Sequence, residues 1–400
     1  MKILVISHMY PSELNVTSGI FVHEQVKSIV SQGHEVKVIS PIPWAPFPLN
    51  KLNEKWDQYS KIPRKSKIDG IEVFYTRYLN FPKSYLLEYY GDFFYLGMKK
   101  VIADLYQTFP FEIIHAHVAL PDGAAGVKLK EKYHVPLVIT IHGQDLQHTI
   151  YRNQKCKAKI AETFEKADKI ILVSSKLKRI ADQEIGYANK SVVIHNGINL
   201  EKITSTRLKI KKLKANERMI LSVSNLYPSK GIDYNLYAVS KLKNKYPNLK
   251  YYIVGGGPER DRLERLAKDL QIEEQVKFLG RLPHEKALEY MQQCEIFSLP
   301  SWKEGFGIAY IEAMAFGKPV IGVHGEGIED VIQQGKSGML VKPKDVDSLV
   351  AALDELLSSP TKREEIGQNA KKIVYDQLTW QENVKQTIDL YKAVIHHGKG

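Results

Sequence analysis

Short apolar runs alternate with amphipathic stretches along the whole 400-residue chain. The alternation is typical of βαβ units, in which buried parallel strands are joined by helices. The strands predicted in the first half are 3–7, 36–40, 113–116, 137–141, 170–173 and 192–195. Those predicted in the second half are 219–223, 251–254, 276–279, 296–299, 319–322 and 339–341. The pattern therefore occurs twice.

A chain of this length is too long for one ordinary hydrophobic core, so two domains are expected. We predict an α/β protein with two doubly wound parallel-sheet domains, at 1–200 and 217–375. Residues 201–216 are highly charged and lack apolar periodicity, which is typical of a hinge. Residues 376–396 have a helical pattern with an apolar side, and this last helix is expected to pack back across the first domain.

Two segments of the first domain stand outside this pattern. Prolines crowd the region around residues 42–67, which predicts a long irregular excursion rather than a helix or strand. Residues 85–109 follow as a predicted helix that is rich in aromatic residues and carries Lys99 and Lys100. Two interpretations of it stay open: a helix packed on the sheet, or a surface that meets a membrane or a lipid-linked acceptor.

The net charge of +12 lies in the first 216 residues, because acidic and basic residues balance from 217 onward. No recognisable nucleic-acid module accompanies it, so we expect an anionic lipid surface or anionic acceptor rather than nucleic acid. Cys156 and Cys294 fit neither a zinc site nor a disulfide framework. With no signal peptide and no membrane-spanning run, the chain is expected to be cytoplasmic, at most peripheral on the inner face of the membrane.

The most specific motif contains Glu304, Gly305, Phe306, Gly307 and Glu312. It follows a predicted strand, and a helix is expected to start near Gly307. That would place Glu304 above the N-terminus of the helix and Glu312 within its second turn. Free N–H groups at a helix N-terminus favour a phosphate, and the carboxylates could accept hydrogen bonds from sugar hydroxyls. The alternative is that both are ordinary solvated glutamates.

A second group follows the first two strands of the second domain. Asn225 and Lys230 come after strand 219–223, where ligands of open α/β sheets bind, so Lys230 is expected to meet a diphosphate. A solvated lysine at a helix start is the alternative. Gly255 and Gly256 follow strand 251–254, and glycines there let the backbone approach a ligand closely. A plain tight turn explains this cluster equally well.

In the first domain, Gly19 opens a helix after the first strand, and His142 ends another strand before Gly143. Placement at the carboxyl edge of the sheet favours a functional role for His142 over a structural one. Other motifs are rejected. Gly335-Lys336-Ser337 lacks the first glycine of a phosphate loop, Asp345 is expected to cap a helix, and His115 and His117 have no identifiable third metal ligand.

With these residues in hand, the chain resembles family 4 of the retaining glycosyltransferases, which have the GT-B fold of two Rossmann-like domains facing a cleft. The carboxylate spacing from Glu304 to Glu312 is the most specific part of the resemblance. The segment 195–198 is also similar to the family pattern. The opening segment 10–25 looks like that of enzymes that build bacterial teichuronic acids.

The resemblance implies roles for individual residues. Glu304 would contact donor sugar hydroxyls, Glu312 the ribose and Lys230 the diphosphate, while Gly19 would line the phosphate side near the acceptor and His142 would lie beneath the sugar. Residues Gly305, Phe306, Gly307, Gly255 and Gly256 would complete the donor site. The family usually has arginine where this chain has Asn225, so the contact with the diphosphate is expected to be weaker or to involve Arg281.

The resulting hypothesis is a glycosyltransferase that moves a sugar with retention from a nucleotide diphosphate sugar to a glycan or lipid-linked acceptor. A UDP-sugar is favoured and a GDP-sugar is the alternative. Glu304, His142 and Lys230 are the predicted catalytic residues, and no metal or other cofactor is expected because Lys230 and helix N-termini would stabilise the leaving group. A nucleotide-sugar epimerase of the same fold and a catalytically silent nucleotide-sugar binder are the rival hypotheses.

Overall fold

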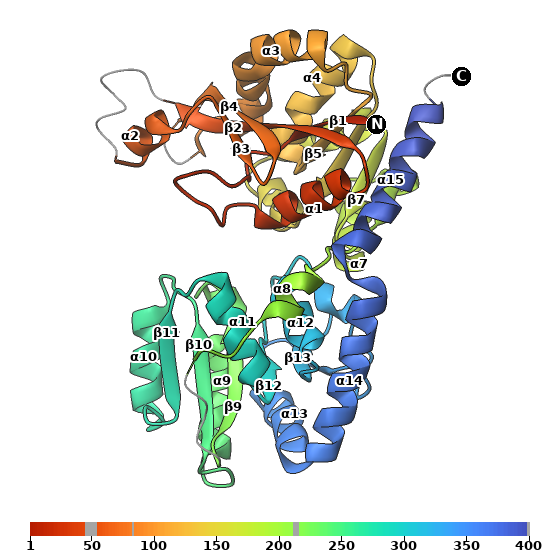
Figure 1. Ribbon diagram of the computed structural model, residues 1–400. Coiled ribbons are helices and arrows are strands. Elements are labelled where there is room, and N and C mark those ends of the chain that lie inside the picture. The colour runs from red at the N-terminus through yellow and green to blue at the C-terminus, as the bar shows by residue number, and fades with distance from the viewer. Residues whose placement is uncertain (45–53, 82–83, 211–215, 398–400) are drawn as a thin grey trace. The chain divides into compact units, whose positions relative to one another are not determined.

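The computed structural model describes residues 1–44, 54–81, 84–210 and 216–397. These residues form two compact units (Figure 1). The first unit contains Met1–His195 and Trp380–Gly400, and the second contains Asn196–Thr379. Of the predicted hinge, residues 211–215 lie outside the described part of the chain, and residues Leu200–Ser205 form helix α8.

The sheet of the first unit has eight strands in the order β3-β4-β2-β1-β5-β6-β7-β8. Neighbouring strands are parallel except for β3 and β4. The chain winds to one side of β1 and then to the other, so the topological switch point lies between β1 and β5. The strands are β1 (Lys2–Ile6), β2 (Glu35–Trp44), β3 (Lys65–Ile68), β4 (Ile71–Leu79), β5 (Ile113–His117), β6 (Leu137–Ile141), β7 (Lys169–Leu172) and β8 (Ser191–Val193).

The last helix of the chain belongs to this first unit. Val384, Ile388 and Tyr391 join the same hydrophobic core as Ile3 and Val38. Helix α15 contacts α1, as Figure 1 shows in blue and red. The prediction that the C-terminal helix packs back on the first domain is therefore confirmed. The helices of the unit are α1 (Ile20–Ser31), α2 (Glu54–Lys61), α3 (Tyr90–Thr108), α4 (Ala124–Tyr133), α5 (Gln144–Gln147), α6 (Gln154–Lys166), α7 (Ser175–Glu184) and α15 (Trp380–His397).

The prediction of an irregular excursion at 42–67 is wrong for the described part of that segment. Residues 42–44 continue β2, and α2 and β3 follow, while 45–53 lie outside the described residues. Pro41 and Pro43 are tolerated in β2 because they lie beyond Ile39, the last β2 residue paired with β1. That side of the strand needs no N–H donors. The pairing partner on the other side, β4, is missing from the predicted strands.

The second unit has six parallel strands in the order β11-β10-β9-β12-β13-β14, and its switch point lies between β9 and β12. Its strands all overlap those predicted. They are β9 (Arg218–Val223), β10 (Leu249–Val254), β11 (Val276–Gly280), β12 (Ile296–Ser298), β13 (Val320–Val323) and β14 (Met339–Val341). Its helices are α8, α9 (Ile232–Leu242), α10 (Arg260–Asp269), α11 (His284–Gln293), α12 (Ile308–Ala315), α13 (Val346–Ser358) and α14 (Pro360–Gln377).

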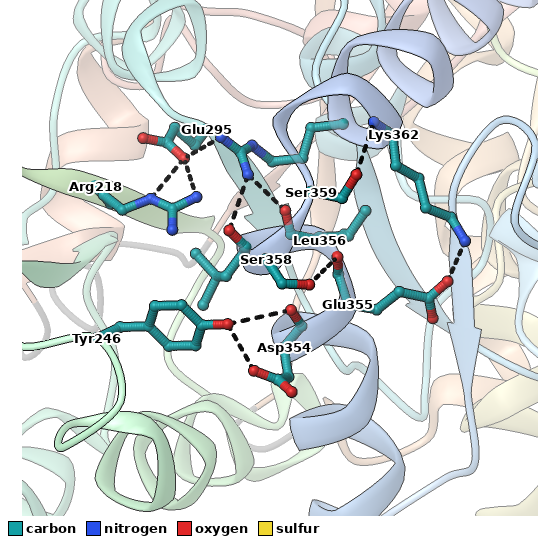
Figure 2. Close-up of polar contacts among 11 residues, drawn as sticks. Arg218, Tyr246, Glu295, Asp354, Glu355, Leu356, Ser358, Ser359 and Lys362 are labelled. Atoms are coloured by element: carbon teal, nitrogen blue, oxygen red, sulfur yellow. Dashed lines mark hydrogen bonds and ion pairs between the residues drawn. The ribbon is translucent and has the colours of Figure 1, made fainter.

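A network of ion pairs lies at the edge of the second sheet where its strands begin (Figure 2). Glu295, just before β12, accepts from Arg218 at the start of β9 at 3.0 Å and from Arg363 of α14 at 3.1 Å. Arg363 also donates to the carbonyl of Leu356 at 2.6 Å, at the end of α13. These contacts tie α13 and α14 to the strands at the end opposite the loops described below, so this edge has a structural role.

Helix α3 supports the first of the two interpretations of segment 85–109. Its buried residues include Phe94, Met98 and Ile102, and the helix packs against β4. Tyr85, Tyr89 and Leu96 nevertheless remain exposed. Across the described ranges, no helix is long and apolar enough to span a membrane.

Candidate active site

The loops that follow β9 and β12 meet at the switch point of the second sheet. Lys230 ends the short helical turn Pro228–Lys230 after β9, and Glu304 lies on the loop after β12. The Lys230 Nζ atom donates to Glu304 Oε2 at 2.6 Å, and the two side chains are 20% and 17% exposed. The structure thus brings together two of the predicted catalytic residues, 74 positions apart in the chain.

Gly231 explains why these two loops approach so closely. Its φ of +67° is in the left-handed region, and a Cβ atom there would lie 2.2 Å from the carbonyl oxygen of Pro300. The N–H of Trp302 donates to the carbonyl of Ser229 at 3.0 Å, which joins the two loops directly. Only glycine meets both demands, so Lys230 is held opposite Glu304.

The loop from Glu304 to Gly307 leads into α12, as predicted. Phe306 is buried and anchors the loop, and Gly307, with φ +99°, is the residue before the helix. Within the described chain, no side chain caps this helix start, so its first N–H groups are available to an anion. The backbone N–H of Glu304 donates to Glu326 Oε2 at 2.6 Å. Sequence reasoning missed Glu326, although its place between Gly325 and Gly327 after a predicted strand was a usable signal.

The glycines after β10 are required by close contacts with neighbouring loops. A Cβ atom on Gly255 would lie 1.7 Å from the carbonyl oxygen of Ser224, so the backbones of these two loops are in direct contact. A Cβ atom on Gly256 would lie 3.0 Å from the side chain of Arg281. Asn225 and Arg281 are both exposed at the same carboxyl edge of the sheet. The arrangement leaves Arg281 available to a ligand beside the glycines.

Glu312 lies within α12 and meets a residue that sequence reasoning did not select. His284 opens α11, and its Nε2 atom donates to Glu312 Oε1 at 2.6 Å. The hydrogen bond to Glu312 raises the pKa of His284 above its usual value, which burial alone would lower. The Glu312 side chain is 12% exposed, whereas that of His284 is 43% exposed. A lone histidine at a helix start gave no signal of this contact in the sequence.

The first unit brings together Gly19 and His142. Gly19 precedes α1 with φ +57°, and a Cβ atom on it would lie 2.0 Å from the carbonyl oxygen of Met9. Two residues later, the ring of Phe21 lies against the ring of His142, with 4.5 Å between their centroids. Gly19 is therefore needed for the close turn that brings the N-terminus of α1 to the end of β6.

His142 is the first of three neighbouring neutral histidines, and the third of them contacts the last helix. His142 Nε2 lies 3.0 Å from His117 Nδ1, and the His117 ring lies 4.3 Å from that of His115. Both His115 nitrogens are occupied, by Thr140 at 2.7 Å and by the hydroxyl of Tyr391 at 2.6 Å, which argues against the metal interpretation of His115 and His117. Burial lowers the pKa of His115 and of His142 to about 3, so both rings are uncharged at neutral pH.

Two ring nitrogens of these three histidines lack a hydrogen-bond partner among the described residues. His142 Nδ1 and His117 Nε2 are buried, and neither has a hydrogen-bond partner among the residues described. In a neutral ring one nitrogen carries the proton and the other accepts. His142 Nδ1 is therefore a free donor if His117 donates between the rings, and a free acceptor if His142 donates. Buried polar atoms normally have partners, so an orphan at the end of β6 points to a ligand.

A second polar pair lies at the switch point of the first sheet. The carboxylate of Asp122, after β5, accepts from the backbone N–H of His8 at 3.0 Å and from its Nδ1 at 2.5 Å. Burial alone would lower the pKa of His8, but the charge and hydrogen bond of Asp122 raise it. Burial raises the pKa of Asp145, close by, to about 7. Sequence reasoning missed His8, Asp122 and Asp145, although His8 and Asp145 lie just beyond predicted strands.

Comparisons with known proteins agree with this geometry. Residues 18–202 match Glycosyltransferase Family 4 and residues 205–373 match Glycosyl transferases group 1. The chain is 26% identical to the putative teichuronic acid biosynthesis glycosyltransferase TuaC of Bacillus subtilis, over 98% of this chain and 99% of that protein. It is 27% identical to the N-acetyl-alpha-D-glucosaminyl L-malate synthase of Bacillus anthracis, over 100% and 99%.

Solved structures show the same fold. The sucrose-phosphate synthase of Thermosynechococcus elongatus superposes with a TM-score of 0.80 at 21% identity, covering 99% of this chain and all of that one. HepE of Anabaena, in complex with UDP, gives a TM-score of 0.71 at 21% identity over 98% and 100%. With two parallel-sheet units and both domain types present in order, the chain belongs to the GT-B glycosyltransferases, with a family 4 domain followed by a group 1 domain.

Proposed function

We propose that this glycosyltransferase moves a sugar with retention from a nucleotide diphosphate sugar, preferably a UDP-sugar, to a glycan or lipid-linked acceptor in bacterial cell-envelope polysaccharide synthesis. The observation that carries the proposal is the Lys230–Glu304 pair beside the uncapped start of α12. The name of the TuaC relative supports the envelope role, and the UDP and UDP-glucose complexes of HepE support the donor class.

In this proposal the second unit binds the donor. The diphosphate binds Lys230 and the first N–H groups of α12, because a cation and a helix N-terminus both favour negative charge. Glu304 then accepts from hydroxyls of the transferring sugar, and Glu312 accepts from the ribose. Arg281, beside Gly256, supplies a second positive charge where Asn225 offers none. Gly255, Gly305, Phe306 and Gly307 shape the backbone around the ligand.

The chemical step is the departure of the diphosphate with an oxocarbenium-like sugar left behind. The acceptor hydroxyl attacks the face that the diphosphate leaves and gives its proton to the departing diphosphate oxygen, so the configuration is retained. Lys230 stabilises the growing negative charge. His142, on the first unit, is neutral because it is buried, and a neutral ring does not oppose the positive charge of the sugar as an imidazolium would. Its unsatisfied Nδ1 is the atom we assign to the sugar.

We further propose that the reaction needs no metal, because Lys230 and the α12 N-terminus supply the positive potential at the leaving group. Turnover measured as release of UDP should be unchanged in EDTA. Loss of turnover in EDTA that returns with manganese or magnesium would contradict this.

A peripheral contact with the inner face of the cell membrane fits the surface of the first unit. Tyr85, Tyr89 and Leu96 are exposed, and Lys99 and Lys100 are exposed on the same helical segment. Aromatic and basic residues together favour an anionic interface. The protein should sediment with vesicles of phosphatidylglycerol and be released by high salt, because screening shortens the attraction to about 8 Å at physiological ionic strength. Equal binding to phosphatidylcholine vesicles would contradict this.

The experiment that tests the proposed function is a thermal-shift panel of UDP-, GDP- and ADP-sugars. A ligand at about 100 times its dissociation constant stabilises the folded state by roughly 2.7 kcal/mol, which such a panel detects. We expect a UDP-sugar to give the largest shift. The donor that binds is then incubated alone and with acceptors. Conversion of the sugar without an acceptor would indicate an epimerase, and binding without UDP release with any acceptor would indicate a silent binder.

A further inference from the structure

One oxygen of the Glu312 carboxylate accepts a hydrogen bond, and among the described residues the other oxygen accepts none. His284 Nε2 donates to Oε1 at 2.6 Å, and across the described residues no hydrogen bond reaches Oε2. The carboxylate is nearly buried on α12, whereas the imidazole lies on the surface at the start of α11. A carboxylate held at one oxygen keeps a fixed rotamer and presents the other oxygen in one direction.

The charges around His284 favour its protonated form. Glu312 and Glu285 raise the pKa of the imidazole, while Lys202 of α8 and burial lower it, and the net result is a raised pKa. The imidazolium therefore compensates the charge of Glu312 when no ligand is bound. A nearly buried carboxylate without such a partner would favour the protonated form or turn toward solvent.

We propose that His284 is a positioning residue for nucleotide recognition: it holds Glu312 so that Oε2 receives a hydroxyl of the donor ribose. This rests on the proposed function, in which Glu312 binds the ribose. The chemical class that it selects is a ribonucleoside diphosphate over a nucleotide without ribose hydroxyls. His284 itself need not touch the ligand, because its effect passes through the carboxylate.

The test measures nucleotide dissociation constants by calorimetry for the wild type and His284→Ala. The probes are UDP and 2′,3′-dideoxy-UDP, with GDP and its dideoxy form as the second pair. For the ribonucleotide, we expect His284→Ala to weaken binding about tenfold, the scale of one hydrogen bond to a charged group. For the dideoxy nucleotide, the wild type and the variant should bind within about twofold of each other, because the hydroxyl that Glu312 reads is absent.

A matched control lies two residues further along the same helix. Lys286 pairs with the nearly buried Glu289 at 3.0 Å, and Glu289 binds the backbone of Lys209 and Ile210 rather than the donor loops. Lys286→Ala should leave both dissociation constants unchanged. His284→Gln keeps an N–H donor without the charge, and it should recover part of the ribonucleotide affinity. Thermal melting of each variant shows whether the fold is kept.

Each outcome separates this inference from the proposed function. If wild type binds neither UDP nor GDP, the proposed donor class is wrong and the inference falls with it. If it binds a ribonucleotide but His284→Ala weakens that nucleotide and its dideoxy form equally, the donor class stands. The role of His284 in ribose recognition is then wrong.

Discussion

Both units place a cation and a carboxylate across the switch point of their sheets. In the first unit these are His8, after β1, and Asp122, after β5, at 2.5 Å. In the second they are Lys230, after β9, and Glu304, after β12, at 2.6 Å. The loops that follow the corresponding strands thus carry the same kind of pair in two sheets with different sequences. This is the position where open α/β sheets bind ligands.

The two pairs differ in burial and in the kind of cation. Asp122 is completely buried and its partner is an imidazole, whereas Lys230 and Glu304 are both partly exposed and the cation is an ammonium group. The first unit surrounds its pair with further neutral imidazoles, while the second adds the open helix start of α12. A permanent positive charge suits a diphosphate, and uncharged rings suit hydroxyl groups. The two units therefore place different polar groups at the same position of the same topology.

The largest expected effect is that of Lys230→Ala, because in the proposed function Lys230 stabilises the transition state, where the charge on the leaving group is greatest. Removing one preorganised donor of this kind costs ~2.7–4 kcal/mol, so turnover should fall about a hundred- to a thousandfold. The measurement is steady-state release of the nucleotide. The control is Lys241→Ala, which removes a lysine from an exposed pair with Asp347 in the same unit. Turnover of Lys230→Ala within threefold of wild type would show that the diphosphate is held elsewhere.

Glu304→Gln should have the next largest effect, because in the proposed function Glu304 binds the transferring sugar. Loss of a charged hydrogen bond costs ~1.5–3 kcal/mol, which corresponds to about a ten- to hundredfold fall in turnover. Free UDP lacks the sugar, so its dissociation constant from calorimetry should change less than threefold. A tenfold weaker binding of free UDP would mean that Glu304 contacts the nucleotide.

Substituting arginine for Asn225 tests whether positions 225 and 230 bind the same diphosphate. If positions 225 and 230 face the same diphosphate, Lys230→Ala combined with Asn225→Arg should recover about tenfold of the lost turnover, the scale of one charged hydrogen bond. Asn225 is exposed, so the substitution needs no repacking. Release of the nucleotide from the single and double variants is compared at equal donor concentration. No recovery in the double variant would separate the two positions.

The smallest expected effect is on stability in the first unit. The raised pKa of His8 means that its stabilising contribution is present below pH ~6.5 and is lost as pH rises through the folded-state pKa. Asp122→Asn removes the charge behind that shift. The ion pair should contribute ~1–2 kcal/mol to the free energy of unfolding, because the one-third exposure of His8 weakens its attraction to Asp122. Asp122→Asn should therefore lower the melting temperature by about 2–8 °C at pH 6.

The pH dependence distinguishes this charge effect from simple loss of packing. The difference in melting temperature between wild type and Asp122→Asn should narrow between pH 6 and pH 9. Burial raises the pKa of Asp145 to about 7, and the charge of Asp122 adds to this increase. Asp122→Asn therefore also lowers the pKa of Asp145, which favours the variant at higher pH and narrows the difference in the same direction. A difference that stays constant across this range would show that Asp122 acts through its shape alone.

The sequence by itself determined six strands of each sheet, the helix after Gly307 and the apolar face of α15, because these depend on local periodicity and on glycine conformation. It did not predict β3 and β4 of the first sheet. It also placed Lys230 and Glu304 at the ends of strands. Which strands become neighbours was decided only by the tertiary structure, since β9 lies beside β12 and not only beside β10. That adjacency pairs Lys230 with Glu304. The adjacency of β1 and β5 pairs His8 with Asp122, and the contact between α11 and α12 pairs His284 with Glu312. Hydrogen bonds between residues far apart in the chain leave no periodic trace, so the partners that set charge and orientation appear only in the folded protein.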